Sequence, residues 1–226
     1  MLELFLDNET LPCSDERVKK EIADGIKPPG NMSKPETIAK WALEDKPRLV
    51  KEAIAKTALD GSFGRVCCIT YAYGDEPVQG IIDRDEKVVL TTFFKAVDKA
   101  LKSASSSATM LRPTVIGHNV TGFDLRFLWQ RAIINGMKPH PLLPWGAMGW
   151  SDSVRDTMHM WNPDKDKRIA LHKLCLALGV ISPKDKNGMT GADVALLWQK
   201  REYAKILAYG KDDTAAMREC YRKMTL

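Results

Sequence analysis

The sequence lacks the features that mark membrane-spanning, secreted and zinc-binding proteins. No apolar run approaches the roughly 18 residues that a membrane-spanning helix needs. The five cysteines include no C-x-x-C pair, which argues against a disulfide framework or a zinc site and favours reduced thiols. The first residues lead directly into an acidic segment and not into a signal sequence. We therefore expect a cytoplasmic protein without a membrane partner.

The charge of the chain is only weakly biased. Lys and Arg number 34 against 29 Asp and Glu, which gives a formal net charge of +5. A mildly basic balance permits a polyanionic partner but does not require one. With 226 residues, 44% of them hydrophobic, the chain is long enough for one good core. The sequence predicts a single domain over residues 1–226, with residues 14–60 inserted into it.

Alternation in the first segment, LFLDNETLP, predicts a strand that carries two carboxylates. Leu4 and Leu6 share one face of a strand predicted over Leu2–Asp7, and the side chains of Asp7 and Glu9 leave its end on the other face. Neighbouring carboxylates repel and raise each other's pKa, so the pair is reasonable if a divalent cation lies between them or solvent reaches both. The simpler alternative is an acidic strand end that runs into a Leu-Pro turn.

A helical insertion is predicted after this strand, followed by a β-rich stretch. The spacing of apolar residues predicts helices over Glu36–Leu43 and Arg48–Leu59, entered through a Pro-rich loop. The β-branched and aromatic run Arg65–Tyr73 predicts a buried strand, and Val78–Asp83 predicts its hairpin partner. Together with the first strand, these would form the antiparallel start of a sheet.

The middle of the chain has the pattern of a β–α–β unit. A helix is predicted over Glu86–Lys102, a short apolar strand over Thr114–Gly117 and a second helix over Phe123–Asn135. Units of this kind place functional residues just past the end of the strand. Asn119 and Asp124 lie there.

The C-terminal part carries the last candidate residues. Its expected elements are a short strand or extended segment Ser153–Met160 and helices Ala170–Leu178, Ala192–Gln199 and Glu202–Met224. A charged loop is expected over Pro183–Gly191. Tyr209 and Asp213 are four residues apart and therefore share one face of the last helix. Asp212 is rotated about 100° away from Asp213.

Taken together, these motifs resemble those of the DEDD (DnaQ-like) superfamily of 3′–5′ exonucleases. LDNETLP resembles the first exonuclease motif, HNVTGFDLRFL the second, and YGKDD the third in the Y-x-x-x-D form of the tyrosine (DEDDy) subclass. The order of segments is similar to that of stand-alone exonucleases related to the proofreading domain of family-B DNA polymerases. Asn8 stands where an apolar residue is usual, and Asp212 adjoins the expected third-motif carboxylate. The resemblance implies an α/β, RNase H-like fold, in which helices flank a mixed β-sheet and a helical insertion follows the first strand.

The resemblance also implies a catalytic site. Its metal ligands would be Asp7, Glu9, Asp124 and Asp213. Oxygen ligands suit Mg²⁺ or Mn²⁺, and two such ions about 3.5–4 Å apart would support hydrolysis of a phosphodiester. Asp7 would bridge both ions, Glu9 and Asp213 would complete the shell of the first, and Asp124 would hold the second mainly through water. Tyr209 would orient the attacking water.

The implied substrate is the 3′ end of single-stranded DNA, with nucleoside 5′-monophosphates as products. Asn119 and the backbone of Thr10 and Leu11 would lie near the terminal nucleotide, with Phe123 supporting it by packing. RNA stays an alternative, since recognition of the 2′-OH depends on the shape of the pocket. The alternative from another class is a non-catalytic module that binds nucleic acid or a protein partner.

Each motif taken alone also has a simpler structural interpretation. Asn119 could cap a turn, Asp124 could be a carboxylate favoured at a helix N-terminus, and Tyr209 could be a packing residue. The charged segments 165–168 and 184–186 are expected to be solvated, with phosphate contact as the alternative. Four lysines of the insertion would contact phosphates if it lies near the substrate entrance: Lys19, Lys20, Lys27 and Lys34.

Overall fold

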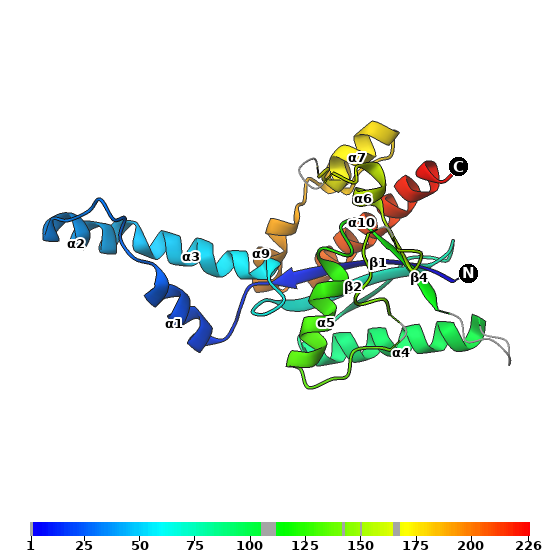
Figure 1. Ribbon diagram of the computed structural model, residues 1–226, viewed down its shortest axis with the longest axis horizontal. Helices are drawn as coiled ribbons and strands as arrows, with labels where there is room; N and C mark the ends of the chain where they lie inside the picture. Colours follow the sequence, from blue (N-terminus) through cyan, green and yellow to red (C-terminus); the bar gives the residue numbers. More distant parts are fainter. Residues whose placement is uncertain (1, 105–111, 142, 150, 165–167) are drawn as a thin grey trace.

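A mixed sheet forms the centre of the computed structural model, which describes residues 2–104, 112–141, 143–149, 151–164 and 168–226 (Figure 1). The strand order is β3-β2-β1-β4-β5. The strands are β1 (Leu2–Leu11), β2 (Arg65–Tyr73), β3 (Gln79–Ile82), β4 (Pro113–Gly117) and β5 (Val154–Asp156). β1, β2 and β3 pair antiparallel, whereas β4 runs parallel to β1 and to β5. The predicted mixed sheet, with its antiparallel start, is confirmed.

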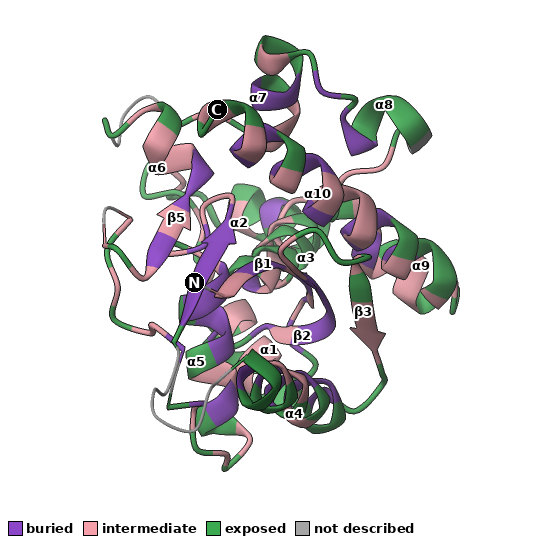
Figure 2. Ribbon diagram, turned by 90° about the vertical axis from the view of Figure 1, so that its right-hand side faces the viewer, coloured by how far each residue is buried: buried purple, intermediate pink, exposed green. Residues whose placement is uncertain are grey.

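Helices cover both faces of this sheet. α4 (Glu86–Ala104) and α5 (Asp124–Ile134) pack on one face, where Leu4 and Leu6 of β1 join their core. α10 (Tyr203–Met224) crosses the other face, where it covers Phe5. The two faces follow from the alternation of side chains along β1. Figure 2 shows the central strands buried beneath these helices.

Among the remaining helices of the C-terminal half, periodicity predicted two, over Leu171–Leu178 and Val194–Gln199, with ends within two residues of those observed. The elements that complete the C-terminal half are α6 (Thr157–Trp161), α7 (Leu171–Leu178), α8 (Pro183–Asn187), η3 (Gly191–Asp193) and α9 (Val194–Gln199). The expectation of a loop over Pro183–Gly191 was wrong for Pro183–Asn187, which forms α8. The side chain of Ser182 caps α8 by accepting a hydrogen bond from the backbone N–H of Asp185, and proline follows at the first helical position.

The segment predicted over Ser153–Met160 divides into strand and helix. β5 ends at Asp156, whose side chain accepts a hydrogen bond from the backbone N–H of Met158 and so caps α6. Of the charged segment 165–168, the residues Lys165, Asp166 and Lys167 lie outside the described residues.

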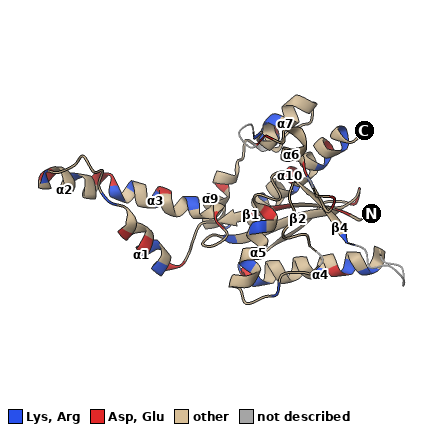
Figure 3. Cartoon of the chain, in the orientation of Figure 1, with Lys and Arg blue, Asp and Glu red and all other residues tan. Residues whose placement is uncertain are grey.

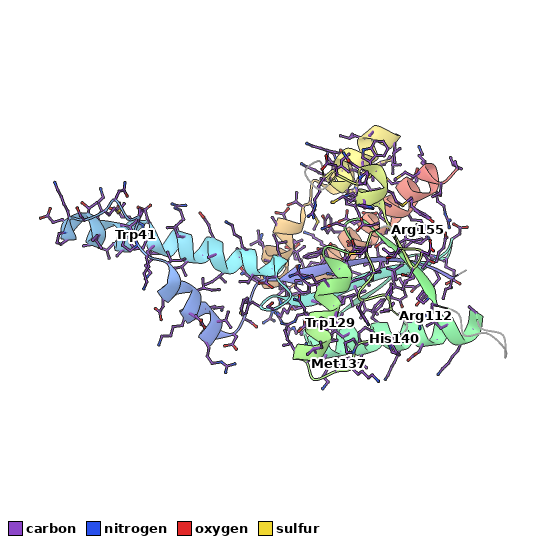
Figure 4. All side chains as sticks on the ribbon, viewed as in Figure 1. Trp41, Arg112, Trp129, Met137, His140 and Arg155 are labelled. Carbon is purple, nitrogen blue, oxygen red and sulfur yellow. The ribbon has the colours of Figure 1, made fainter. Side chains whose placement is uncertain are left out.

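Residues 14–60 form a helical arm that projects from the end of β1 (Figure 1). The arm consists of α1 (Glu16–Gly25), α2 (Pro35–Glu44), α3 (Lys46–Lys56) and the short η1 (Thr57–Leu59). The second and third helices were expected, but α1 was missed because its sequence, ERVKKEIADG, has few apolar residues and none is buried. In α2 the buried residue is Trp41, which lies within the arm in Figure 4.

Hydroxyl groups tie the root of the arm to the sheet. Thr10 Oγ1 of β1 donates to the carbonyl of Ala58 at 2.6 Å. Thr57 Oγ1 accepts from the backbone N–H of Cys13 at 2.7 Å and donates to the carbonyl of Ile54 at 2.6 Å. The arm therefore begins from a fixed base directly beside the strand that carries Asp7 and Glu9.

Candidate active site

The sequence predicted that Asp7 and Glu9 leave the end of a strand, but both lie within β1. β1 continues to Leu11 because β2 pairs with it along this whole stretch, opposite Thr70 at Asp7 and opposite Cys68 at Glu9. Asn, Asp and Glu are poor strand formers, so local propensity predicted an early end that the pairing with β2 overrides. The ladder between β1 and β4 stops at Phe5, before the carboxylates.

α10 brings a third carboxylate to this pair. One oxygen from each of Asp7, Glu9 and Asp213 lies within 4.8 Å of the other two. Tyr209, one helical turn before Asp213, is 9% exposed, and the Asp213 carboxylate is among the groups that raise the pKa of its hydroxyl. Asp212 points elsewhere and forms an ion pair with Lys186 of α8 at 2.8 Å.

Asp124 lies beside this group of three rather than within it. Its Oδ1 accepts a hydrogen bond of 3.1 Å from the backbone N–H of Asn8, and its side chain is 2% exposed. The charge of Asp124 nevertheless contributes to the raised pKa of Glu9. The N-terminus of α5 is therefore bonded to β1 between the two carboxylates of the first motif.

Burial and mutual repulsion make these carboxylates hold protons more tightly than usual. Burial, and then the charge of Asp213, raise the pKa of Asp7 to about 8. Burial raises the pKa of Asp213 to about 6. Burial and neighbouring carboxylates also raise the pKa of Glu9 and of Asp124. Converging oxygens that repel one another when ionised fit a hard divalent cation, which would offset that repulsion.

Thr70 of β2 holds α10 against the strand. Its Oγ1 donates to the carbonyl of Gly210 at 2.9 Å and lies 2.7 Å from Thr214 Oγ1. A methyl group on Gly210 would lie only 3.1 Å from Thr70 Cγ2, so glycine permits this close approach. Thr70 and Thr214 carry no motif that sequence reasoning could find, since their role depends on the packing of α10.

A β-bulge adjoins Glu9. Cys68 lies opposite Glu9 and Val66 lies opposite Thr10, so Cys67 is an extra residue in β2. Bulges of this kind bend a strand and re-aim its side chains, and they are frequent beside active sites. Because of the extra residue, Arg65 faces the same side of the sheet as α9.

Asp156 fixes the turn between β4 and α5. It is 2% exposed and accepts hydrogen bonds from the backbone N–H groups of Asn119 at 2.9 Å and Thr121 at 3.2 Å, and from the Thr121 hydroxyl at 2.8 Å. Asn119 has a left-handed backbone with φ of 62°. Asn119 and Thr121 line a cavity of about 200 Å³ together with Arg168.

The other predicted substrate residues differ in how accessible they are. Phe123 packs on Phe127 with ring centroids 5.3 Å apart and lines a separate cavity of about 230 Å³. The side chain of Leu11 is 3% exposed within the core beside α9, and the hydroxyl of Thr10 is bonded to the arm. The backbone of these two residues, and not their side chains, was the predicted contact.

The sequence of residues 48–225 matches the family described as predicted 3′–5′ exonucleases related to the exonuclease domain of PolB. The chain belongs to this family. β1, with Asp7 and Glu9, lies before the matched residues. No curated protein matches the chain.

The exonuclease fold is also seen in a solved structure. The family B DNA polymerase from the hyperthermophilic archaeon Pyrobaculum calidifontis matches with a TM-score of 0.56 and 18% sequence identity, over 74% of this chain and 22% of the polymerase. This likeness shows an RNase H-like fold, and together with the family match it supports a PolB-exonuclease-like DEDD fold. None of the helices in the described residues has the length and apolar character of a membrane-spanning segment.

Proposed function

We propose that this protein is a metal-dependent 3′–5′ exonuclease of the tyrosine subclass, which releases nucleoside 5′-monophosphates from the 3′ ends of single-stranded DNA. The observation that carries the proposal is the convergence of Asp7, Glu9 and Asp213 oxygens within 4.8 Å, with Tyr209 one helical turn before Asp213 on α10. The match of the chain to a family of exonucleases supports the reaction type.

Asp7, Glu9 and Asp213 would hold divalent cations, Mg²⁺ or Mn²⁺, with Asp124 completing the site. Two such cations, when bound, would activate a water and stabilise the leaving oxygen of an in-line displacement at phosphorus. Asp124 contributes structurally as well, since its bond to the Asn8 N–H fixes α5 against β1. One oxygen of Asp124 is thereby engaged, which leaves the other for the site.

Tyr209 would position the attacking water and would not act as its base. Burial and the surrounding carboxylates raise the pKa of its hydroxyl further above the ordinary value, so the group stays protonated at neutral pH. A protonated hydroxyl keeps its lone pairs available to accept a hydrogen bond from water.

The terminal nucleotide would lie against the turn after β4 and the backbone that follows Glu9. Asn119 would contact it by its amide, Phe123 would pack against it, and the backbone of Thr10 and Leu11 would line the opposite side. The cavities beside Asn119 and Phe123 support this placement. Five buried, free cysteines suit a reducing compartment, in accordance with a cytoplasmic location.

The proposal is tested by digesting 3′-labelled and 5′-labelled DNA and RNA oligonucleotides with Mg²⁺, Mn²⁺ or EDTA. We expect single-nucleotide shortening from the 3′ end of DNA that EDTA abolishes. Preferred digestion of RNA would instead indicate an exoribonuclease. Binding without cleavage under all metal conditions would indicate a non-catalytic module.

Two variants complete this test. Asp7→Ala and Asp124→Asn should abolish cleavage and leave the protein folded, because Asp124→Asn retains the oxygen that accepts from Asn8. Removing a repelling carboxylate should not destabilise the metal-free protein. Near-normal cleavage by either variant at equal metal concentration would refute the site.

A further inference from the structure

We infer that a cluster of arginines on aromatic rings beside the active site binds the phosphodiester backbone of the substrate strand, on the 5′ side of the scissile phosphate. This inference rests on the proposed function and adds a binding surface to it. We call the cluster the arginine patch and define it by Arg65, Arg84, Trp198, Arg201 and Tyr203.

Contacts link four of these side chains into one continuous surface, and Arg201 lies in the adjoining turn between α9 and α10. The guanidinium of Arg65 lies 5.3 Å from the ring centroid of Trp198, and that of Arg84 lies 5.7 Å from the ring of Tyr203. Arg84 Nε donates to the Tyr203 hydroxyl at 3.0 Å. The rings of Trp198 and Tyr203 are edge to face with centroids 4.8 Å apart. Aromatic faces of this kind hold guanidinium groups in place without neutralising them.

Among the described residues, neither Arg65 nor Arg84 forms an ion pair with a carboxylate. Within the part of the chain that the structure describes, Arg65 Nε is buried without a hydrogen-bond partner, and Arg65 Nη1 donates to the carbonyl of Arg84 at 3.4 Å. Arg131 shows the contrasting case, since its Nε and Nη2 both bond to the carboxylate of Glu86, at 2.9 and 2.7 Å. A partly buried arginine without an anion has hydrogen-bonding capacity that a phosphate matches well.

Acidic groups near the patch are already engaged. Glu202 is ion-paired with Lys205. Asp83 accepts from the backbone N–H of Asp85 at 2.8 Å, and Asp85 accepts from that of Lys87 at 2.8 Å. These bonds direct the carboxylates to the local turns, and among the described residues neither Asp83 nor Asp85 forms an ion pair with a patch arginine.

Arg201 stands at a position where glycine is usual. It ends the turn between α9 and α10 with a left-handed φ of 59°. The backbone N–H of Arg201 donates to the carbonyl of Trp198 at 3.0 Å, and the backbone N–H of Glu202 donates to the carbonyl of Leu197 at 2.9 Å. This is the hydrogen-bond pattern that closes the C-terminus of a helix. A side chain strains this backbone, and such strain is found at functional sites. Arg201 and the adjacent Lys200 are exposed, which adds two cations to this edge.

The patch lies where a strand held at the carboxylates would pass. Arg65 pairs with Leu11, two residues beyond Glu9 on β1. Trp198 packs against the cluster that buries Leu11 and Tyr209. Tyr203 begins α10, about 9 Å along the helix axis from Tyr209. An enzyme that removes 3′ nucleotides retains the strand 5′ of the cut, and its phosphates would meet the patch.

The test compares two double variants by the salt dependence of binding to a fluorescent single-stranded DNA in EDTA, where cleavage cannot occur. Arg84→Gln with Arg201→Gln removes two charges from the patch. Lys95→Gln with Lys99→Gln removes two exposed charges from α4, on the other face of the sheet. The patch variant lacks two phosphate-binding charges, so its slope of log K against log salt should be shallower than that of the wild type by about 1.4. The lysine variant should keep the wild-type slope. Equal slopes for the patch variant and the wild type would overturn the inference.

A single variant, Arg201→Gly, separates binding from folding. Glycine relieves the left-handed backbone, so the melting temperature should stay the same or rise while DNA binding weakens. Unchanged binding together with higher stability would make Arg201 only a strained turn residue and would count against the patch. Binding is measured in EDTA and does not depend on cleavage. A failure of the arginine patch to bind DNA can therefore be told apart from a lack of nuclease activity.

Discussion

Asp212 and Asp213 are neighbours in the sequence but have different surroundings. Asp213 joins Asp7 and Glu9, whereas Asp212 pairs with Lys186. Tyr209→Phe keeps the ring packing and removes only the hydroxyl, so we expect turnover to fall on the order of 100-fold through misplaced water, with metal affinity nearly unchanged. Steady-state kinetics and metal titration measure the two quantities.

The same helix supplies the controls for this prediction. Asp213→Ala should lower both turnover and metal affinity, and Asp212→Ala should remain active. An inactive Asp212→Ala beside an active Asp213→Ala would mean that the third motif is assigned in the wrong register.

Asp7 makes the stability of the metal-free protein depend on pH. Its pKa is raised from 3.8 to about 8, so the folded state binds this proton more tightly than the unfolded chain. The resulting stabilisation is fully present below pH 3.8 and is lost as the pH rises through about 8. Urea unfolding in EDTA should therefore show lower stability at pH 8 than at pH 5. Asp7→Asn should flatten this dependence, and Mg²⁺ should restore stability to the wild type at pH 8. A wild-type protein equally stable at both pH values would contradict the assignment of Asp7 to a crowded acidic site.

At the scale of elements, the site depends on the contact between α10 and β2. Gly210→Ala would favour the helix by about 1 kcal/mol but would crowd Thr70, at a cost of about 1–3 kcal/mol. We expect a small net loss of stability and a clear loss of activity, because Tyr209 and Asp213 move with the helix. Thermal melts and cleavage rates measure both effects.

Gly25→Ala is the matched control, because nothing lies within 4 Å of the position of its added methyl group. Its stability should change by no more than about 0.5 kcal/mol, and its activity should be unchanged. If Gly210→Ala were as active as this control, close approach of α10 would not matter for catalysis.

At the scale of the whole molecule, the arm is the feature that extends beyond the exonuclease body. Its helices carry charges of both signs along their length (Figure 3), and Lys19 already pairs with Glu16 at 2.8 Å. We predict that replacing four lysines together by glutamine weakens DNA binding and flattens its salt dependence, by about 0.7 in slope for each lysine that binds a phosphate. The four are Lys19, Lys20, Lys27 and Lys34. Fluorescence anisotropy over a salt series provides the measurement, and an unchanged slope would mean that the arm has a structural role or another partner.

The accuracy of the sequence-based predictions varied with how strongly each element is patterned. Arg65–Tyr73 and Glu86–Lys102 carry dense β-branched or periodic apolar residues, and the structure has a strand and a helix there. α1 and α8 are short and polar and depend on their caps, Asp15 and Ser182, so apolar periodicity could not reveal them. The second half of β1 exists because β2 pairs with it.

By itself, the sequence determined which candidate side chains share a face of one element. Asp7 and Glu9 are two residues apart on a strand, and Tyr209 and Asp213 are four apart on a helix, so a local repeat fixes both pairs. Only the tertiary structure decided that the pairs meet, that Asp124 bonds to Asn8 beside them, and that a bulge turns Arg65 toward α9. The physical reason is that side-chain direction follows from backbone repeat within a few residues, whereas contact between distant segments depends on how whole helices and strands pack.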